Sequence, residues 1–151
     1  MIVTAKEKPG RERLAGLAAF LPVFQAPGFS FGEWGGGEKT ESGAITMPYF
    51  ALSEEASAFV HAAYDLGWVL EGFDWPKWKD TQEAQSLLEP SVLADATPEQ
   101  LAQLLTTLIR QDRFVEGGLA SAFKSGLLTR ILERANRLLK ELDAQPAARE
   151  G

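Results

Sequence analysis

Two arginines near the end of a helical stretch are the residues best suited, by type and spacing, to hold an anion. Arg110 and Arg113 stand three residues apart, so they share one side of any helix that extends that far. Each guanidinium can pair with a carboxylate or a phosphate, and the amides after Gly117 add donors at the next helix start. This pair of arginines therefore predicts one of two arrangements. Either they form an anion pocket, or they tie the helix ends to Asp74 or Glu33.

Aromatic side chains are concentrated in one third of the chain. Eleven of the 15 aromatic residues lie between positions 29 and 78. A concentration of this kind predicts a core between a hairpin and the helices that cover it. Trp34, Trp75 and Trp78 stand beside polar, Pro or Gly residues, so the alternative is that they line a groove.

A second set of arginines, Arg130, Arg134 and Arg137, forms a basic stripe at positions i, i+4 and i+7 of the last helical stretch. Such a stripe is typical of a solvated helix flank. The alternative is a nucleic-acid contact, but an isoelectric point near 4.9 works against the counterion release that drives such binding.

The remaining polar residues predict no reaction, cofactor or metal site. The chain has no cysteine and one histidine, which excludes a disulfide framework, a zinc ribbon, an iron–sulfur cluster and a thiol nucleophile. His61 is interpreted as a helix-surface residue, because no partner for base catalysis is evident. The carboxylates Glu33, Glu54, Glu55 and Asp74 share no spacing on one scaffold, so they indicate a metal or an acid/base pair only weakly.

Composition predicts one soluble domain. The chain has 151 residues, of which 45% are hydrophobic, and a net charge of −6. Residues 28–99 carry −10 and residues 100–142 carry +3, an asymmetry that can join two halves of one domain or offer a basic face to a partner. We expect one globular domain over residues 11–142, a partly disordered segment over 1–10 and a frayed tail over 143–151. With no membrane-length apolar stretch or signal peptide, the expected location is cytoplasmic.

The spacing of apolar residues and the positions of Pro, Gly and capping residues predict the elements of the first half. A short amphipathic helix covers residues 11–21 and stops before Pro22. Residues 29–34 and 44–52 read as the strands of a hairpin with a long glycine-rich loop, and Pro48 places the second strand at an edge or breaks it. Ser53 is a good N-cap for a helix that ends near Gly67.

The second half reads as helices, with one open question at its start. Residues 68–70 are a candidate third short strand. A helix begins at Asp74 or Trp75 and is expected to reach residues 89–90, and Thr97 opens another with a capping box. Two more helices follow, over 119–124 and 127–142. The fold class is therefore α+β: a mainly helical single domain with a small two- or three-stranded antiparallel sheet packed on helices.

Several strings resemble, in the same order, the prokaryotic family called domain of unknown function 6508. They are residues 31–34 (FGEW), 45–49 (ITMPY), 73–76 (FDWP), and Arg110 with 112–117 (DRFVEG). The resemblance spans about residues 14–142 and implies a small mixed fold. Family members often carry a histidine after the Glu–Gly pair, where this sequence has Gly118. No activity is established for the family, so the resemblance implies no reaction.

These observations predict a small cytosolic binding or protein-interaction module without enzymatic activity. Its partner is expected to be a protein or a small anionic ligand, with no membrane contact. One alternative is an enzyme that holds an anionic or nucleotide-like substrate through an arginine–carboxylate site, and a third is nucleic-acid binding through the basic C-terminal helix. The candidate binding surface consists of Trp34, Tyr49, Asp74, Trp75, Arg110, Arg113 and Glu116.

Overall fold

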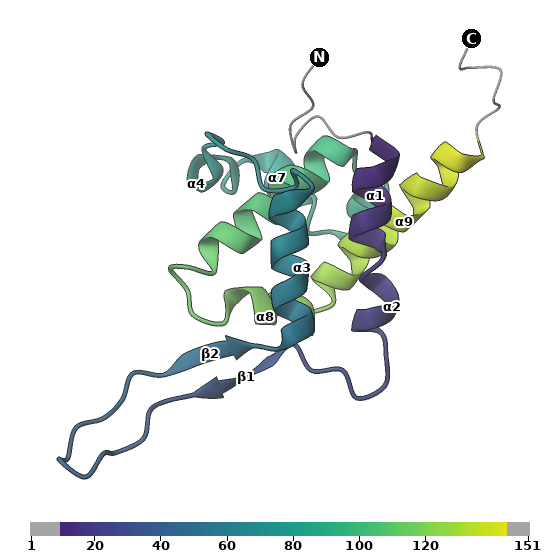
Figure 1. Cartoon of the computed structure of the whole chain (residues 1–151). Helices are drawn as coiled ribbons and strands as arrows, with labels where there is room; N and C mark the ends of the chain where they lie inside the picture. The colour runs from purple at the N-terminus through teal and green to yellow at the C-terminus, as the bar shows by residue number, and fades with distance from the viewer. Residues whose placement is uncertain (1–9, 145–151) are drawn as a thin grey trace.

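A computed structural model describes residues 10–144 of the chain, which form a mainly helical α+β domain (Figure 1). The expectations for a disordered N-terminal segment and a frayed tail fall largely on residues 1–9 and 145–151, outside the described residues. In chain order the elements are α1 (Gly10–Ala18), α2 (Leu21–Phe24), β1 (Gly32–Gly35), β2 (Tyr49–Leu52), α3 (Glu54–Asp65), α4 (Trp75–Trp78), α5 (Gln82–Ser86), α6 (Pro90–Leu93), α7 (Pro98–Gln111), α8 (Gly118–Lys124) and α9 (Leu127–Asp143).

Helix α9 organises the packing, because α1, α2, α6, α7 and α8 all contact it. Its buried stripe of Leu128, Ile131, Leu132 and Ala135 follows the i, i+3, i+4, i+7 spacing that one helix face requires. Helix α1 lies along α9 (Figure 1), and their ends are joined where the Arg11 Nε lies 2.8 Å from the Asp143 carboxylate. Asp143 is therefore the last residue of a helix rather than part of a tail.

Phenylalanine rings fill the space between α2, α3, α8 and the start of the hairpin. Phe24 lies at the centre of this cluster and contacts five other rings with centroid separations of 5.1–6.2 Å. This part of the aromatic concentration is therefore core, as one of the two interpretations predicted. The contacting rings are Phe20, Phe29, Phe31, Phe59 and Phe123.

The first helix ends before Pro22, as predicted, because α1 ends at Ala18. The short helix α2 that follows it was not predicted. Pro22 lies in the first turn of α2, where its missing N–H costs no hydrogen bond. Helix α3 agrees with its prediction: the Ser53 hydroxyl accepts from the Ala56 amide at 3.2 Å, and Glu54 and Glu55 occupy the positive end of the helix dipole.

The segment 68–70 is not a strand, so of the two predicted possibilities the two-stranded sheet is correct. A side chain, rather than a neighbouring strand, binds its backbone. The buried Thr106 hydroxyl of α7 accepts from the Leu70 amide at 2.8 Å. The same hydroxyl lies 2.7 Å from the Ala102 carbonyl of its own helix and 3.2 Å from the Trp68 carbonyl, so its one proton is shared between these two acceptors.

The single helix expected over residues 75–89 is also wrong, because the chain forms α4, α5 and α6 there. Thr81 makes the first break: its hydroxyl donates to the Trp78 carbonyl at 2.7 Å and accepts from the Ala84 amide at 3.2 Å. It thus ends α4 and caps α5. Pro90 then starts α6. The capping box at Thr97, where α7 begins, is confirmed in both directions.

The hairpin projects from the helical body as an arm (Figure 1). Strands β1 and β2 are antiparallel with Trp34 opposite Phe50, and an isolated bridge joins Lys39 to Ile45 farther out. Pro48 lies immediately before β2, so the prediction that it breaks the second strand is confirmed.

Candidate functional site

The base of the hairpin is held by the loop that connects α7 to α8. The Phe50 amide donates to the Glu116 Oε2 atom at 2.8 Å. Phe50 pairs with Trp34 of β1, and its amide points to the opposite side, toward the outer edge of β2. The Glu116 carboxylate therefore occupies a position on that edge where another strand would otherwise pair.

Trp34 lies over the same loop. A Cβ atom added to Gly117 would lie 2.7 Å from Trp34 Cζ2, so the indole rests directly on the glycine backbone. Gly117 has a φ of 78°, a conformation that favours glycine. The Trp34 ring also meets Phe50 edge-on at 5.5 Å, yet 58% of the residue stays exposed. The hairpin and the α7–α8 loop thus form one continuous surface.

Asp112 fixes the other end of this loop. Its Oδ1 atom accepts from the Leu119 amide at 2.9 Å, in the first turn of α8. Gly117 is the N-cap of α8 and has no side chain to do this. The sequence showed only a carboxylate several residues before two glycines, so this capping role was not predicted.

Asp74 and Trp75 reach the surface from α4. The Asp74 carboxylate accepts from the Lys77 amide at 3.2 Å and caps α4, in agreement with the predicted helix start at Asp74 or Trp75. The Trp75 ring lies 6.2 Å from the Phe114 ring of the α7–α8 loop. Trp75 is half-buried and borders the loop, whereas Trp78 is buried and points its indole N–H to Glu83.

The two arginines of the candidate surface do not form a common anion pocket. Arg113 is exposed and lines a cavity of about 250 Å³ with mainly apolar residues of β2, α3, α7 and α8, and Arg110 is absent from that lining. Within residues 10–144, neither guanidinium forms an ion pair, so the predicted ties to Asp74 or Glu33 are not made. Asp74 uses its carboxylate on a backbone amide instead.

Four exposed apolar side chains border the predicted residues and were not expected there. Met47 is 83% exposed and Phe114 is 79% exposed, while Ile45 and Val115 are also largely accessible. Ile45 and Met47 belong to an alternating pattern that sequence analysis placed in a packed strand, but here it runs along the projecting arm. Phe114 and Val115 follow a helix end within a charged string, a position that could have marked them as exposed.

Other candidate groups lie apart from this surface. His61 is exposed on α3, in agreement with the interpretation as a helix-surface residue. Within the described part of the chain, no three His, Cys, Asp or Glu side chains gather closely enough to hold a metal ion. No helix between residues 10 and 144 combines the length and the apolar character needed to cross a bilayer.

Comparison with known proteins finds a family model that covers most of the chain. The model of a family of unknown function, DUF6508, matches residues 9–141. The chain belongs to this family. The predicted resemblance is therefore confirmed, and Gly118 of this DUF6508 protein begins α8. Neither a curated protein nor a solved structure matches the chain.

Proposed function

We propose that this DUF6508 protein is a binding module that docks another protein through its hairpin arm and the α7–α8 loop. The observation that carries the proposal is that these two segments expose six large apolar side chains. We call this set the apolar surface: Trp34, Ile45, Met47, Tyr49, Phe114 and Val115.

Burial of the apolar surface by a partner would be favourable. Apolar area removed from water contributes about 25 cal/mol per Å². Trp, Tyr, Phe and Met are also the types enriched at protein interfaces, because they supply large contact area with few polar groups to desolvate. Exposed apolar side chains scattered singly are ordinary, but here six of them lie within two short segments, the arm and the loop at its base.

The base of the arm is already positioned for docking. The bond from Phe50 to Glu116, the indole of Trp34 on Gly117 and the Asp112 cap of α8 hold the two segments in one arrangement. A surface that is ordered before binding loses less conformational entropy on association. Glu116 thus supports the surface, and Trp34 and Tyr49 supply contact area.

Charge indicates the chemistry of the partner. The arm carries Glu33, Glu38 and Glu41 against a single Lys39, and all four are exposed. A complementary partner therefore presents an apolar patch with lysines or arginines at its rim. Rim charges mainly affect the association rate and its salt dependence, so affinity is expected to rest on the apolar side chains.

Site-specific photo-crosslinking tests the proposal. A benzophenone amino acid replaces Met47 in one sample and the exposed Lys140 of α9 in a matched control, and both proteins are irradiated in lysate of the source cells. We expect a discrete product from position 47 that position 140 does not give. The captured protein is then identified, purified and titrated against the wild-type chain.

Substitution of the apolar surface decides whether the captured protein is a true partner. Trp34→Ala with Met47→Ala is expected to raise Kd about tenfold or more, whereas Lys140→Ala leaves it unchanged. Sedimentation of the chain alone tests for self-association through the same surface. Equal capture at both positions, unchanged affinity of the double variant, or capture of a second copy of this chain would each contradict the proposal.

A further inference from the structure

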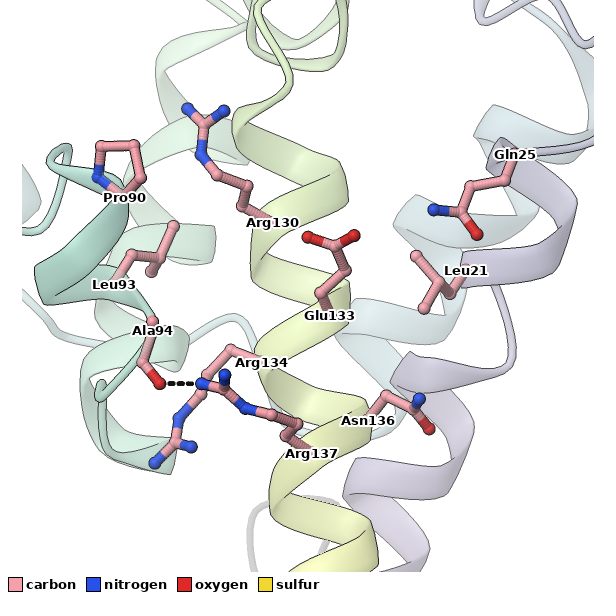
Figure 2. A pocket seen from close by; sticks show the side chains of 10 residues that line it. All are labelled: Leu21, Gln25, Pro90, Leu93, Ala94, Arg130, Glu133, Arg134, Asn136 and Arg137. Atoms are coloured by element: carbon pink, nitrogen blue, oxygen red, sulfur yellow. Dashed lines mark hydrogen bonds between the residues drawn. The ribbon is translucent and has the colours of Figure 1, made fainter.

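A cavity of about 420 Å³ lies between α2, α6 and α9 (Figure 2). It shares no residue with the apolar surface. Three of its lining residues are the arginines of the basic stripe on α9, and one is the acid Glu133. Leu21 and Gln25 of α2 form one wall, and Pro90 and Leu93 of α6 form the other.

Two of these arginines already have partners. Arg134 donates through Nε to the Ala96 carbonyl at 2.8 Å, and its Nη1 atom lies 3.6 Å from the Glu141 carboxylate. Arg137 donates to the Ala94 carbonyl, as Figure 2 shows. Both carbonyls lie just after α6, at Ala94 and Ala96. Carbonyls at a helix C-terminus have no amide partner within the helix, so they are free to accept from a side chain. The stripe is therefore not simply a solvated flank: two of its members fasten α6 to α9.

Arg130 differs from the other two in its Nε atom. This atom is buried and forms no hydrogen bond with any of residues 10–144. Glu133 is three residues away on the same helix, yet no ion pair joins the two side chains. A buried donor without an acceptor is unfavourable, and more so when it carries charge.

The position of Arg130 in α9 adds a second cost. It lies in the first turn after the N-cap Gly126, and that turn contains no acidic residue. The N-terminus of a helix carries partial positive charge, so a cation there is unfavourable and an anion is favourable. The Arg130 Nη1 atom would lie only 2.9 Å from a Cβ on Gly126, which places the guanidinium back against this end of α9. An anion beside Arg130 would relieve both costs.

We propose that this cavity binds a small molecule bearing a compact, multiply charged oxyanion, with Arg130 as its anchor. A guanidinium forms parallel hydrogen bonds to phosphate or carboxylate oxygens, which suits the unpartnered donors. Gln25, Asn136 and Glu133 offer polar contacts for the rest of the ligand, and Leu21 and Leu93 offer apolar ones. The volume lies within the range of ordinary small-molecule sites.

A small ligand fits these observations better than a nucleic acid does. The guanidinium lies in a recess between two helices, whereas binding along a nucleic-acid backbone needs several exposed cations. Arg134 is only 11% exposed in its side chain and is committed to Ala96 and Glu141.

Direct observation of the Arg130 side chain tests this proposal. The full-length protein labelled with ¹⁵N is titrated with pyrophosphate, with citrate and, at matched ionic strength, with sodium chloride. We expect the Arg130 Nε–H resonance to move downfield and saturate with at least one of the two oxyanions, with a Kd of about 1 mM or below. The phosphate and carboxylate probes then show which of the two chemistries the cavity prefers.

Two charge-matched variants locate the site. Arg130→Gln is expected to raise Kd about tenfold or more, and Lys140→Gln, which removes the same charge from an exposed position of α9, to change it less than about twofold. Arg130→Gln should fold, because it removes a buried donor without a partner. If Arg130→Gln does not fold, Arg130→Lys serves instead. It keeps the positive charge but lacks the planar guanidinium with its parallel donors, so it should still weaken binding.

Three results would overturn the proposal. The first is no saturable shift with either oxyanion. The second is a shift that sodium chloride reproduces. The third is binding that Arg130→Gln and Lys140→Gln weaken equally. None of these results affects the apolar surface, which is tested separately.

Discussion

Glu116 and Phe50 are 66 residues apart in sequence, and the carboxylate of the first accepts the backbone amide of the second at 2.8 Å. This contact connects the α7–α8 loop to the outer edge of β2. It helps to hold the base of the arm against the helical body, on the edge of β2 that does not pair with β1.

Glu116→Ala is expected to loosen the arm without unfolding the domain. A hydrogen bond of this kind contributes ~1 kcal/mol, so exchange of the Phe50 amide should become about fivefold faster. Hydrogen exchange followed by NMR measures this rate. Glu41→Ala removes an exposed carboxylate from the arm and serves as the control, with no change expected at Phe50. An unchanged rate in Glu116→Ala would mean that the loop does not hold the strand.

Gly117→Ala is expected to destabilise the protein by two additive effects. The residue has a φ of 78°, and its new Cβ would lie 2.7 Å from the Trp34 ring. Gly28→Ala is a matched control, because Gly28 has a φ of 79° with no atom within 4 Å of the new Cβ. Gly28→Ala should cost about 1 kcal/mol for the backbone alone.

The additional cost of Gly117→Ala measures the contact with Trp34. Overpacking of this kind costs about 1–3 kcal/mol, unless the exposed indole moves away. Urea denaturation of both variants gives the difference, and Trp34 fluorescence in a chain where the other three tryptophans are phenylalanine shows whether the ring moves. Equal costs with unchanged fluorescence would show that Trp34 does not rest on Gly117.

Thr106→Val is expected to destabilise the domain by about 1–3 kcal/mol, because it leaves the Leu70 amide buried without its acceptor. Thr107→Val is the control on the neighbouring position. The Thr107 hydroxyl donates only to the Gln103 carbonyl within its own helix, so its loss should be nearly neutral. Thermal unfolding of the two variants compares them directly, and equal melting temperatures would contradict the role assigned to Thr106.

Arg13 and Trp68 support each other through two contacts. The guanidinium carbon lies 4.5 Å from the centroid of the Trp68 ring, and the indole N–H donates to the Arg13 carbonyl at 3.1 Å. Arg13 also donates to the carbonyls of Leu66 and Gly67, both at 3.0 Å, just beyond α3. Burial lowers the pKa of Arg13, and the residue stays charged at neutral pH.

Arg13→Lys is therefore not expected to replace arginine. The ammonium keeps the charge but loses the planar fork that reaches two carbonyls and stacks on the ring, at a cost of about 1–2 kcal/mol. A double-mutant cycle with Trp68→Phe should give a coupling energy of about 0.5 kcal/mol or more. The measurement is the free energy of unfolding in guanidinium chloride, and strict additivity would show that the two residues do not interact.

Local signals in the sequence determined three helix starts and the mainly helical class. Ser53, Asp74 and Thr97 each accept an amide three residues ahead, an interaction that involves no distant part of the chain. The break at Pro48 and the paired-strand arm follow from the same short-range chemistry. The resemblance to DUF6508 also rested on local strings, and the family match over residues 9–141 confirms it.

Only the tertiary structure decided what the polar and apolar side chains of the candidate site contact. Glu116 finds its partner 66 residues away, Leu70 finds Thr106 instead of a neighbouring strand, and Arg134 and Arg137 each reach a backbone carbonyl beyond α6. A backbone carbonyl or amide is present at every position and has no signature in the sequence. Sequence patterns therefore show which side chains can form bonds, whereas the fold selects the one partner that lies within about 3 Å.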